Sequence, residues 1–199
     1  MTNRLMKIAL LPGHAAAAGG AEVCAGSHKG ESEYRLASRY GPQLAQELTR
    51  LGYEVVQTGR ESAGGTTPSY SAKAANATGA DIAIECHFNA AGPTATGCCV
   101  MHWGKSEQGR RFAAGLSADI AEMLEVRDRG PLAVPTPEDR GTEAFRRSVM
   151  PFFMIEPCFA GSNPDDARAF CALIDSGVWV VRLAYAIDTR LREVYTNLS

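Results

Sequence analysis

Short apolar runs alternate with longer segments of helical periodicity, and this alternation constrains the fold more than any other feature of the sequence. The apolar runs predict strands at residues 5–11, 53–58, 81–88, 97–103 and 150–155. The periodic segments predict helices at 33–51, 67–78 and 106–124, and one or two closing helices within 164–194. Strands that alternate with helices favour a layered α/β sheet with helices on both faces.

The length of 199 residues suits one domain with a full hydrophobic core, so we expect a single domain over residues 1–199. A net charge of −2 does not favour nucleic acid as a partner. The longest apolar runs are too short to span a bilayer, and no membrane partner is expected. The apolar stretch after residues 1–7 is soon interrupted by Pro12-Gly13-His14, which argues against a signal peptide. We therefore expect a protein made in the cytoplasm that reaches the cell wall only if it is released.

The cysteines do not form a C-x-x-C pair, and several lie inside apolar, strand-like runs. They stand at positions 24, 86, 98, 99, 158 and 171. This pattern predicts reduced, buried thiols that act as small apolar side chains. A metal ion, if one is bound, must then be held by histidine and carboxylate.

Three of the predicted strands run directly into a residue that can bind metal or carry a proton. The first strand ends before His14, the third leads into His87, and the last ends at Glu156. Glu33 opens the first predicted helix, after a loop rich in Gly, Ala and Ser over residues 14–32. Two histidines and one carboxylate form a known catalytic zinc shell with an open fourth position. A further acidic group nearby would supply the general base that such a site needs.

An ordered set of short motifs covers most of the chain. The motifs are Pro12-Gly13-His14, Glu33 nineteen residues before Gly52-Tyr53-Glu54-Val55-Val56, Ala75-Asn76, Gly79-Ala80-Asp81, His87-Phe88-Asn89-Ala90, Arg129-Gly130, and Pro151-Phe152-Phe153-Met154-Ile155-Glu156 with Phe159, Asn163 and Asp166. In this order they resemble the zinc-dependent type 3 N-acetylmuramoyl-L-alanine amidases of bacterial cell-wall remodelling and phage endolysins. The resemblance implies a twisted, mostly parallel sheet of five or six strands flanked by helices.

The resemblance also implies an activity and a site. Zn²⁺ would be held by His14, Glu33 and His87, and Glu156 would be the catalytic acid/base. The reaction would cut the amide bond between N-acetylmuramic acid and L-alanine in peptidoglycan or in a released muropeptide. The resemblance does not assign substrate-binding residues. One departure from the family is the run Ala15 to Ala18, where the family usually has glycines.

Two other carboxylates compete for a place in the site. Glu31 stands two residues before Glu33, and we prefer Glu33 because it starts the helix and fits the spacing to Gly52. Glu85 shares a strand face with His87, because side chains alternate along a strand. Glu85 could orient His87, pair with a neighbouring arginine, or replace Glu33 as the ligand.

Four further polar residues have alternative roles. We expect His28 to be an exposed loop residue and His102 to be a strand side chain beside Trp103. Arg129 could touch substrate or be a surface arginine before a glycine turn. Asn89 could bond the substrate backbone or brace its own loop.

Functions of a different class remain open at this point. A catalytically silent wall-binding or regulatory domain could share the fold, because fold does not imply activity. A zinc peptidase acting elsewhere on the stem peptide is a third candidate. The biological role could be that of a phage endolysin or of a cytoplasmic enzyme that recycles muropeptides.

Overall fold

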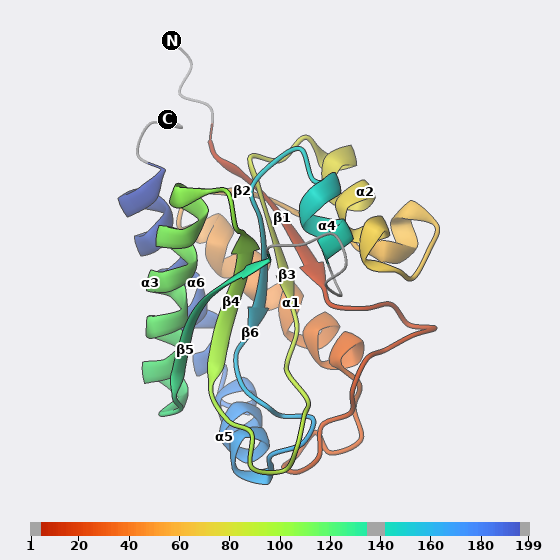
Figure 1. Ribbon diagram of the computed structural model, residues 1–199, viewed down its shortest axis with the longest axis vertical. Coiled ribbons are helices and arrows are strands. Elements are labelled where there is room, and N and C mark those ends of the chain that lie inside the picture. Colours follow the sequence, from red (N-terminus) through yellow and green to blue (C-terminus); the bar gives the residue numbers. More distant parts are fainter. Residues whose placement is uncertain (1–4, 135–141, 196–199) are drawn as a thin grey trace.

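The computed structural model describes residues 5–134 and 142–195 (Figure 1). Within them, six strands form one sheet in the order β2-β1-β3-β6-β4-β5. The strands are β1 (Lys7–Pro12), β2 (Glu54–Gln57), β3 (Ile82–Cys86), β4 (Cys98–Trp103), β5 (Asp128–Val134) and β6 (Phe152–Glu156). Five of these correspond to the predicted strands, and the six-stranded α/β sheet confirms the expected fold class.

Strand direction divides the sheet into two parts. β2, β1, β3 and β6 run parallel to one another, and the long helical connections from β1 to β2 and from β2 to β3 suit parallel pairing. β4 pairs with β6 in the antiparallel direction, and β5 is parallel to β4. The sheet is therefore mostly parallel, as expected, with a reversed pair of strands at one side.

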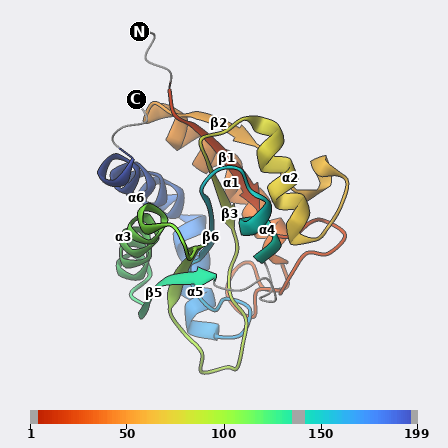
Figure 2. The ribbon, with the colours of Figure 1, turned by 45° about the horizontal axis from the view of Figure 1, so that its top comes forward.

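Helices cover both faces of the sheet (Figures 1 and 2). They are α1 (Glu33–Arg50), the 3₁₀ helix η1 (Arg60–Ala63), α2 (Pro68–Thr78), α3 (Glu107–Leu124), α4 (Thr142–Arg147), α5 (Pro164–Asp175) and α6 (Val178–Val194). α1, α3, α5 and α6 pack on one face, and α2 and α4 pack on the other. α1 starts at an N-cap, where the Ser32 hydroxyl accepts from the backbone N–H of Arg35, and Gly52 follows its end at φ +98°.

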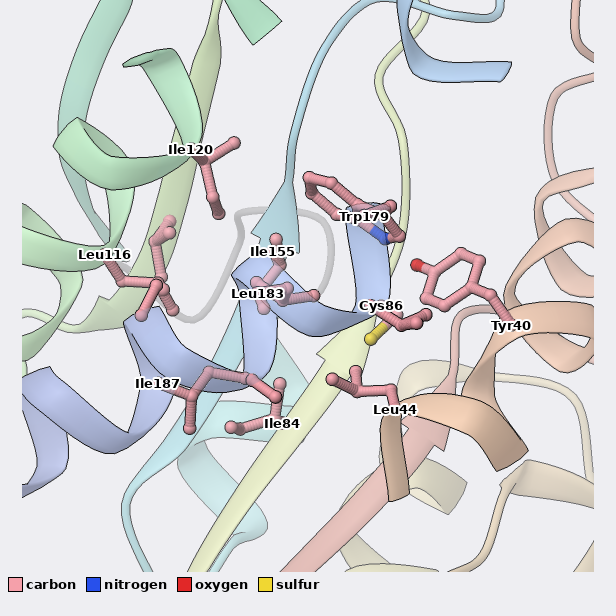
Figure 3. Packing of buried hydrophobic residues seen from close by; sticks show 14 of the residues in the cluster. Tyr40, Leu44, Ile84, Cys86, Leu116, Ile120, Ile155, Trp179, Leu183 and Ile187 are labelled. Atoms are coloured by element: carbon pink, nitrogen blue, oxygen red, sulfur yellow. The ribbon is translucent and has the colours of Figure 1, made fainter. Parts of the chain in front are cut away.

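Alternate side chains of the central strands fill the two cores. Ile84 of β3 points toward α1 and α6, where Tyr40, Leu183 and Trp179 help to form the larger core (Figure 3), and Ile82 of β3 belongs to the same core. Ala83 of β3 belongs to the smaller core beneath α2 and α4, together with Ala9, Leu11, Ala74, Ala75, Phe145, Phe152 and Met154. Because the strand period is two, Glu85 and His87 follow Ala83 on the face of α2.

Three elements were not predicted from the sequence. β5 begins with Asp128, Arg129 and Gly130, its apolar part is only the short stretch from Pro131 to Val134, and only Val134 is buried. Its position at the edge of the sheet tolerates proline, which cannot donate a backbone hydrogen bond. The other two elements, η1 and α4, are too short to show a helical period.

All six cysteines lie in the described part of the chain and are free, and five of them are buried, as predicted. Among the described helices, none by itself has the length and hydrophobicity of a membrane span. α5 and α6 reach that composition only when taken together, across a bend of 89°.

Candidate active site

The site lies where three neighbouring parallel strands end. β1, β3 and β6 are adjacent, and their registers align Pro12 with Cys86 and Cys86 with Ile155. His14 therefore follows β1, His87 follows β3 and Glu156 ends β6 at the same edge of the sheet. Ligand sites in open α/β sheets form at this carboxyl edge.

Glu33 reaches the same edge from the first turn of α1. The loop that precedes α1 folds back over the site, because the N–H groups of Glu33 and Tyr34 donate to the carbonyls of Ala21 and Gly19. Glu33 is buried, and its Oε1 accepts from the Ala21 N–H at 2.9 Å. These contacts fix the direction of the carboxylate.

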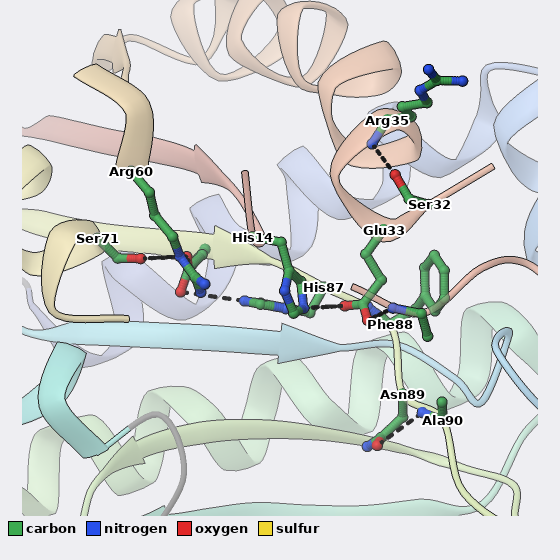
Figure 4. Close-up of polar contacts among 12 residues, drawn as sticks. His14, Ser32, Glu33, Arg35, Arg60, Ser71, His87, Phe88, Asn89 and Ala90 are labelled. Atoms are coloured by element: carbon green, nitrogen blue, oxygen red, sulfur yellow. Dashed lines mark hydrogen bonds and ion pairs between the residues drawn. The ribbon is translucent and has the colours of Figure 1, made fainter. Parts of the chain in front are cut away.

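His14, Glu33 and His87 converge so that one ligand atom from each lies within 4.8 Å of the others (Figure 4). Oε2 of Glu33 lies 3.1 Å from Nδ1 of His87 and 3.3 Å from Nε2 of His14. The same oxygen also accepts from the Phe88 N–H at 3.3 Å. Three of the residues proposed from the sequence are thus brought together by the fold.

Two glycines leave room for these side chains. A Cβ at Gly13 would lie 2.6 Å from Nδ1 of His87, and a Cβ at Gly20 would lie 2.6 Å from Cδ2 of His14. Gly20 has φ +83°, which favours glycine in any case.

His14 itself has φ +66°, an uncommon conformation for a residue with a side chain and one that clusters at functional sites. The alanines after it form a small bridge, Ala15 to Ala18, that closes this loop.

The carboxylates and imidazoles of the cluster shift one another's pKa values strongly. Burial raises the pKa of Glu33, but the imidazoles of His14 and His87 outweigh it and lower the pKa to about 2. Burial lowers the pKa of His87, but Glu85 and Glu33 outweigh it and raise the pKa to about 10. Without a metal ion, a proton on His87 therefore balances the buried carboxylates.

Glu156 lies beside the cluster in a different electrostatic setting. As a residue it is partly exposed, whereas its Oε2 atom is buried and has no hydrogen-bond partner among the described residues. Burial raises its pKa to about 7, helped by the charges of Glu33 and Glu85 and opposed by His87. A carboxyl group with a pKa near neutrality suits proton transfer at physiological pH.

A cleft of about 730 Å³ opens over the cluster. Its walls combine polar groups from the start of α2 with apolar side chains from the sheet. Besides His14, Glu33, His87 and Glu156, they include Thr67, Ser69, Phe88, Asn89, Met101 and Glu143. A cleft of this size with convergent polar groups is typical of a small-molecule site.

Both contacts considered for Glu85 are present in the structure. It forms a buried ion pair with Arg60, and its second oxygen faces His87. Sequence reasoning missed Arg60 and Ser71, which bonds the same carboxylate. The only signal for Arg60 was its place just beyond the end of the second strand, and Ser71 gave none.

Glu31 points away from the cluster. Its carboxylate pairs with Arg39 at 2.6 Å and with His28 at 3.1 Å. The expectation that His28 is exposed was wrong, because its side chain is buried between Glu31 and Asp175, which lies 2.8 Å from its Nε2 atom. A loop histidine between two carboxylates gains partners that the local sequence does not reveal.

The remaining polar residues have structural contacts. His102 is a buried side chain on β4 whose Nδ1 atom lies 3.0 Å from the Trp103 carbonyl. Arg129 is exposed and stacks 5.0 Å from the ring of Phe159. Asn89 lines the cleft and also braces its own loop, because its Oδ1 accepts from the Ala90 N–H.

The donor set is compatible with a zinc ion. Two imidazole nitrogens and a carboxylate oxygen are ligands that Zn²⁺ accepts in catalytic sites, which keep one position open. The three donors face one another at the floor of a cleft, and an acidic group stands next to them. The fold and site together define an α/β domain with a candidate metal centre at the carboxyl edge of its sheet.

The family model described as N-acetylmuramoyl-L-alanine amidase matches residues 8–187, and the chain belongs to this family. Its members are amidases of peptidoglycan and are generally metal-dependent, which makes this chain an N-acetylmuramoyl-L-alanine amidase by family. A search of curated proteins finds no match.

Several solved structures share the fold. An N-acetylmuramoyl-L-alanine amidase from Clostridium difficile 630 is 23% identical, with a TM-score of 0.74 and coverage of 98% of this chain and 99% of that one. The catalytic domain of the CD27L endolysin targeting Clostridia difficile is 21% identical, with a TM-score of 0.70 and coverage of 94% and 97%. Cwp6 from Clostridium difficile is 17% identical, with a TM-score of 0.76 and coverage of 96% of this chain. This chain spans 29% of the Cwp6 chain.

Proposed function

We propose that this chain hydrolyses the amide bond between N-acetylmuramic acid and L-alanine with a zinc ion held by His14, Glu33 and His87. The observation that carries the proposal is the convergence of these three donors beside Glu156 on the floor of the cleft. Membership of the amidase family supplies the substrate class.

Zinc, when bound there, supplies a Lewis acid that polarises the scissile carbonyl and makes a water molecule more acidic. Glu156 accepts a proton from the attacking water, whose oxygen adds to the carbonyl carbon. Glu156 then returns this proton to the nitrogen of L-alanine as the carbon–nitrogen bond breaks. The products are a carboxylate on the lactyl group of the sugar and a stem peptide with a free amino terminus.

The test is digestion of purified peptidoglycan by zinc-loaded protein, followed by mass spectrometry of the soluble products. We expect intact stem peptides that begin with L-alanine and glycan chains that have lost them. Fragments cut within the stem peptide would instead identify a peptidase. Binding of peptidoglycan without any new amino terminus would identify a catalytically silent domain, and either result would overturn the proposal.

The biological setting that we propose is phage-type lysis, in which the protein is made in the cytoplasm and reaches the wall when the inner membrane is opened. The support is the shared fold with the catalytic domain of an endolysin. Cells expressing the protein should lyse after the inner membrane is permeabilised, and cells expressing Glu156→Ala should not. Activity against soluble muropeptides together with an inability to lyse permeabilised cells would favour a recycling enzyme.

A further inference from the structure

Directly behind the candidate metal cluster lies a buried carboxylate, that of Glu85 on β3. Its relative exposure is 0%, and its two oxygens have different neighbours. Oε1 accepts from Nε and Nη2 of Arg60 at 3.2 and 3.0 Å and from the Ser71 hydroxyl at 2.6 Å. Oε2 lies 3.3 Å from Nε2 of His87. One oxygen is thus anchored to η1 and α2, and the other faces the site.

The ring of His87 is held between two carboxylates. Its Nδ1 atom lies 3.1 Å from Glu33 and faces the cluster, so its Nε2 atom points away toward Glu85. Neither Nε2 of His87 nor Oε2 of Glu85 has a hydrogen-bond partner among the described residues. Their mutual contact is close enough for an ion pair but lacks the alignment of a good hydrogen bond.

A histidine that binds a metal ion through Nδ1 carries its proton on Nε2 and needs an acceptor there. Such an acceptor fixes the tautomer and the direction of the ring. Oε2 of Glu85 is buried, has no hydrogen-bond partner among the described residues and faces Nε2 at 3.3 Å, so a small turn of the ring makes it the acceptor. Arg60 and Ser71 hold the opposite oxygen, so the carboxylate cannot turn away from His87.

We propose that Glu85 is the positioning residue of the metal centre: it accepts the Nε2–H of His87 and so aims Nδ1 at the metal ion. This inference rests on the metal site of the proposed function. It also links that site to η1 and α2, because Arg60 and Ser71 place the carboxylate. The alternative is that Glu85 serves only as the counter-ion of buried Arg60.

The test compares Glu85→Gln with Ser71→Ala by zinc titration against a chromogenic chelator. Glutamine keeps the shape of the side chain but has only one acceptor oxygen. This oxygen can accept from Arg60 and Ser71 or from His87, but not from both sides. We expect Glu85→Gln to weaken zinc binding by roughly 10–100-fold, the usual effect of losing such a partner. Ser71→Ala removes one contact to Oε1 and leaves Oε2 in place, so its effect should be smaller. Equal zinc affinity of Glu85→Gln and wild type would overturn the inference.

A spectroscopic readout separates positioning from a purely structural role. In ¹⁵N-histidine NMR spectra of the zinc-loaded wild type, we expect His87 as the Nε2–H tautomer with a signal shifted by its acceptor. Glu85→Gln should move this signal, whereas Ser71→Ala should leave the tautomer unchanged. A metallated Nε2 atom in the wild type would contradict the inference.

A second variant covers the case in which Glu85→Gln does not fold. The double substitution Arg60→Met with Glu85→Met replaces the buried pair with apolar side chains, which proteins often tolerate. It should fold and still show the weakened zinc binding. If the wild type binds no zinc, the proposed metal site itself fails. If the wild type binds zinc and the double variant binds it equally well, only the role of Glu85 fails.

Discussion

Oε2 of Glu33 lies 3.1 Å from Nδ1 of His87, a residue 54 positions further along the chain. The same oxygen lies 3.3 Å from Nε2 of His14. Two imidazoles can share one carboxylate oxygen in this way when a positive charge lies among them. Without metal that charge is a proton on His87, whose pKa the carboxylates raise to about 10 against the effect of burial. A zinc ion would take its place.

Zinc binding should therefore release a proton. At pH 7, His87 of the metal-free protein is protonated, and it must lose this proton to become a ligand. We expect about one proton to leave per zinc ion bound, and the affinity to rise with pH below the pKa of His87. Calorimetry in buffers of different ionisation enthalpy measures the number. Binding without proton release between pH 6 and 8 would be inconsistent with the pKa of His87.

Removing a ligand and removing the acid/base should have different effects. His87→Ala should lose both zinc and activity. Glu156→Ala should keep zinc but lose at least about a hundredfold in rate, the contribution of a general base. Metal analysis of the purified variants and muropeptide assays check both outcomes. Loss of zinc from Glu156→Ala would make Glu156 a ligand.

Glu31 and Glu33 form a matched pair for testing the third ligand. Glu33→Gln should weaken zinc binding substantially, because glutamine removes the negative charge and offers a poorer donor. Glu31→Gln should leave zinc affinity nearly intact, since Glu31 contacts Arg39 and His28 and no member of the cluster. Loss of a pair as exposed as that with Arg39 costs about 0–1 kcal/mol. A larger zinc defect in Glu31→Gln than in Glu33→Gln would reverse the assignment.

The pattern of strands indicated where the candidate site would form. His14, His87 and Glu156 follow strand-like runs, and parallel strands bring their carboxyl ends to one edge, but their roles came from the resemblance to the amidase family. Glu33 was preferred over Glu31 because it starts the predicted helix and fits the spacing to Gly52, and the structure places an N-cap at Ser32 just before it.

The parts that were missed depend on contacts between distant segments. Arg60 and Ser71 are 25 and 14 positions from Glu85 in the sequence, and no local spacing predicts a buried ion pair between such distant residues. The antiparallel pairing of β4 with β6 could not be predicted either, because an apolar run does not indicate the direction in which the strand will pair. β5 carries too few apolar residues to stand out as a strand.

The glycine beneath His87 offers a steric test of the site. A Cβ at Gly13 would approach Nδ1 of His87 and the Cys86 carbonyl to 2.6 and 2.7 Å. Gly13→Ala should therefore push His87 out of place and weaken zinc binding. Gly92→Ala is the control, because its Cβ would meet no atom within 4 Å. Equal zinc affinity in the two variants would mean that the loop around Gly13 adjusts to the new methyl group without displacing His87.

The last prediction concerns the stability of the metal-free protein and uses the pKa of Glu156. Burial raises this pKa from 4.5 to about 7, so between these values the folded protein holds a proton that the unfolded chain has lost. Stability from this group is fully present below pH 4.5 and is lost as the pH rises through 7. A shift of this size corresponds to roughly 3 kcal/mol.

Glu156→Gln removes this ionisation and should flatten the profile. In chelator-treated protein, urea unfolding at pH 5 and pH 8 should show a smaller loss of stability for the variant than for the wild type. His87 contributes a loss in the same direction, because its pKa is raised, but it is present in both proteins. Glu122→Gln, a change at an exposed carboxylate on α3, should keep the wild-type profile. If Glu156→Gln loses stability between pH 5 and 8 as steeply as the wild type, the carboxyl group is not held in its neutral form, and its readiness to act as acid/base must come from the bound metal instead.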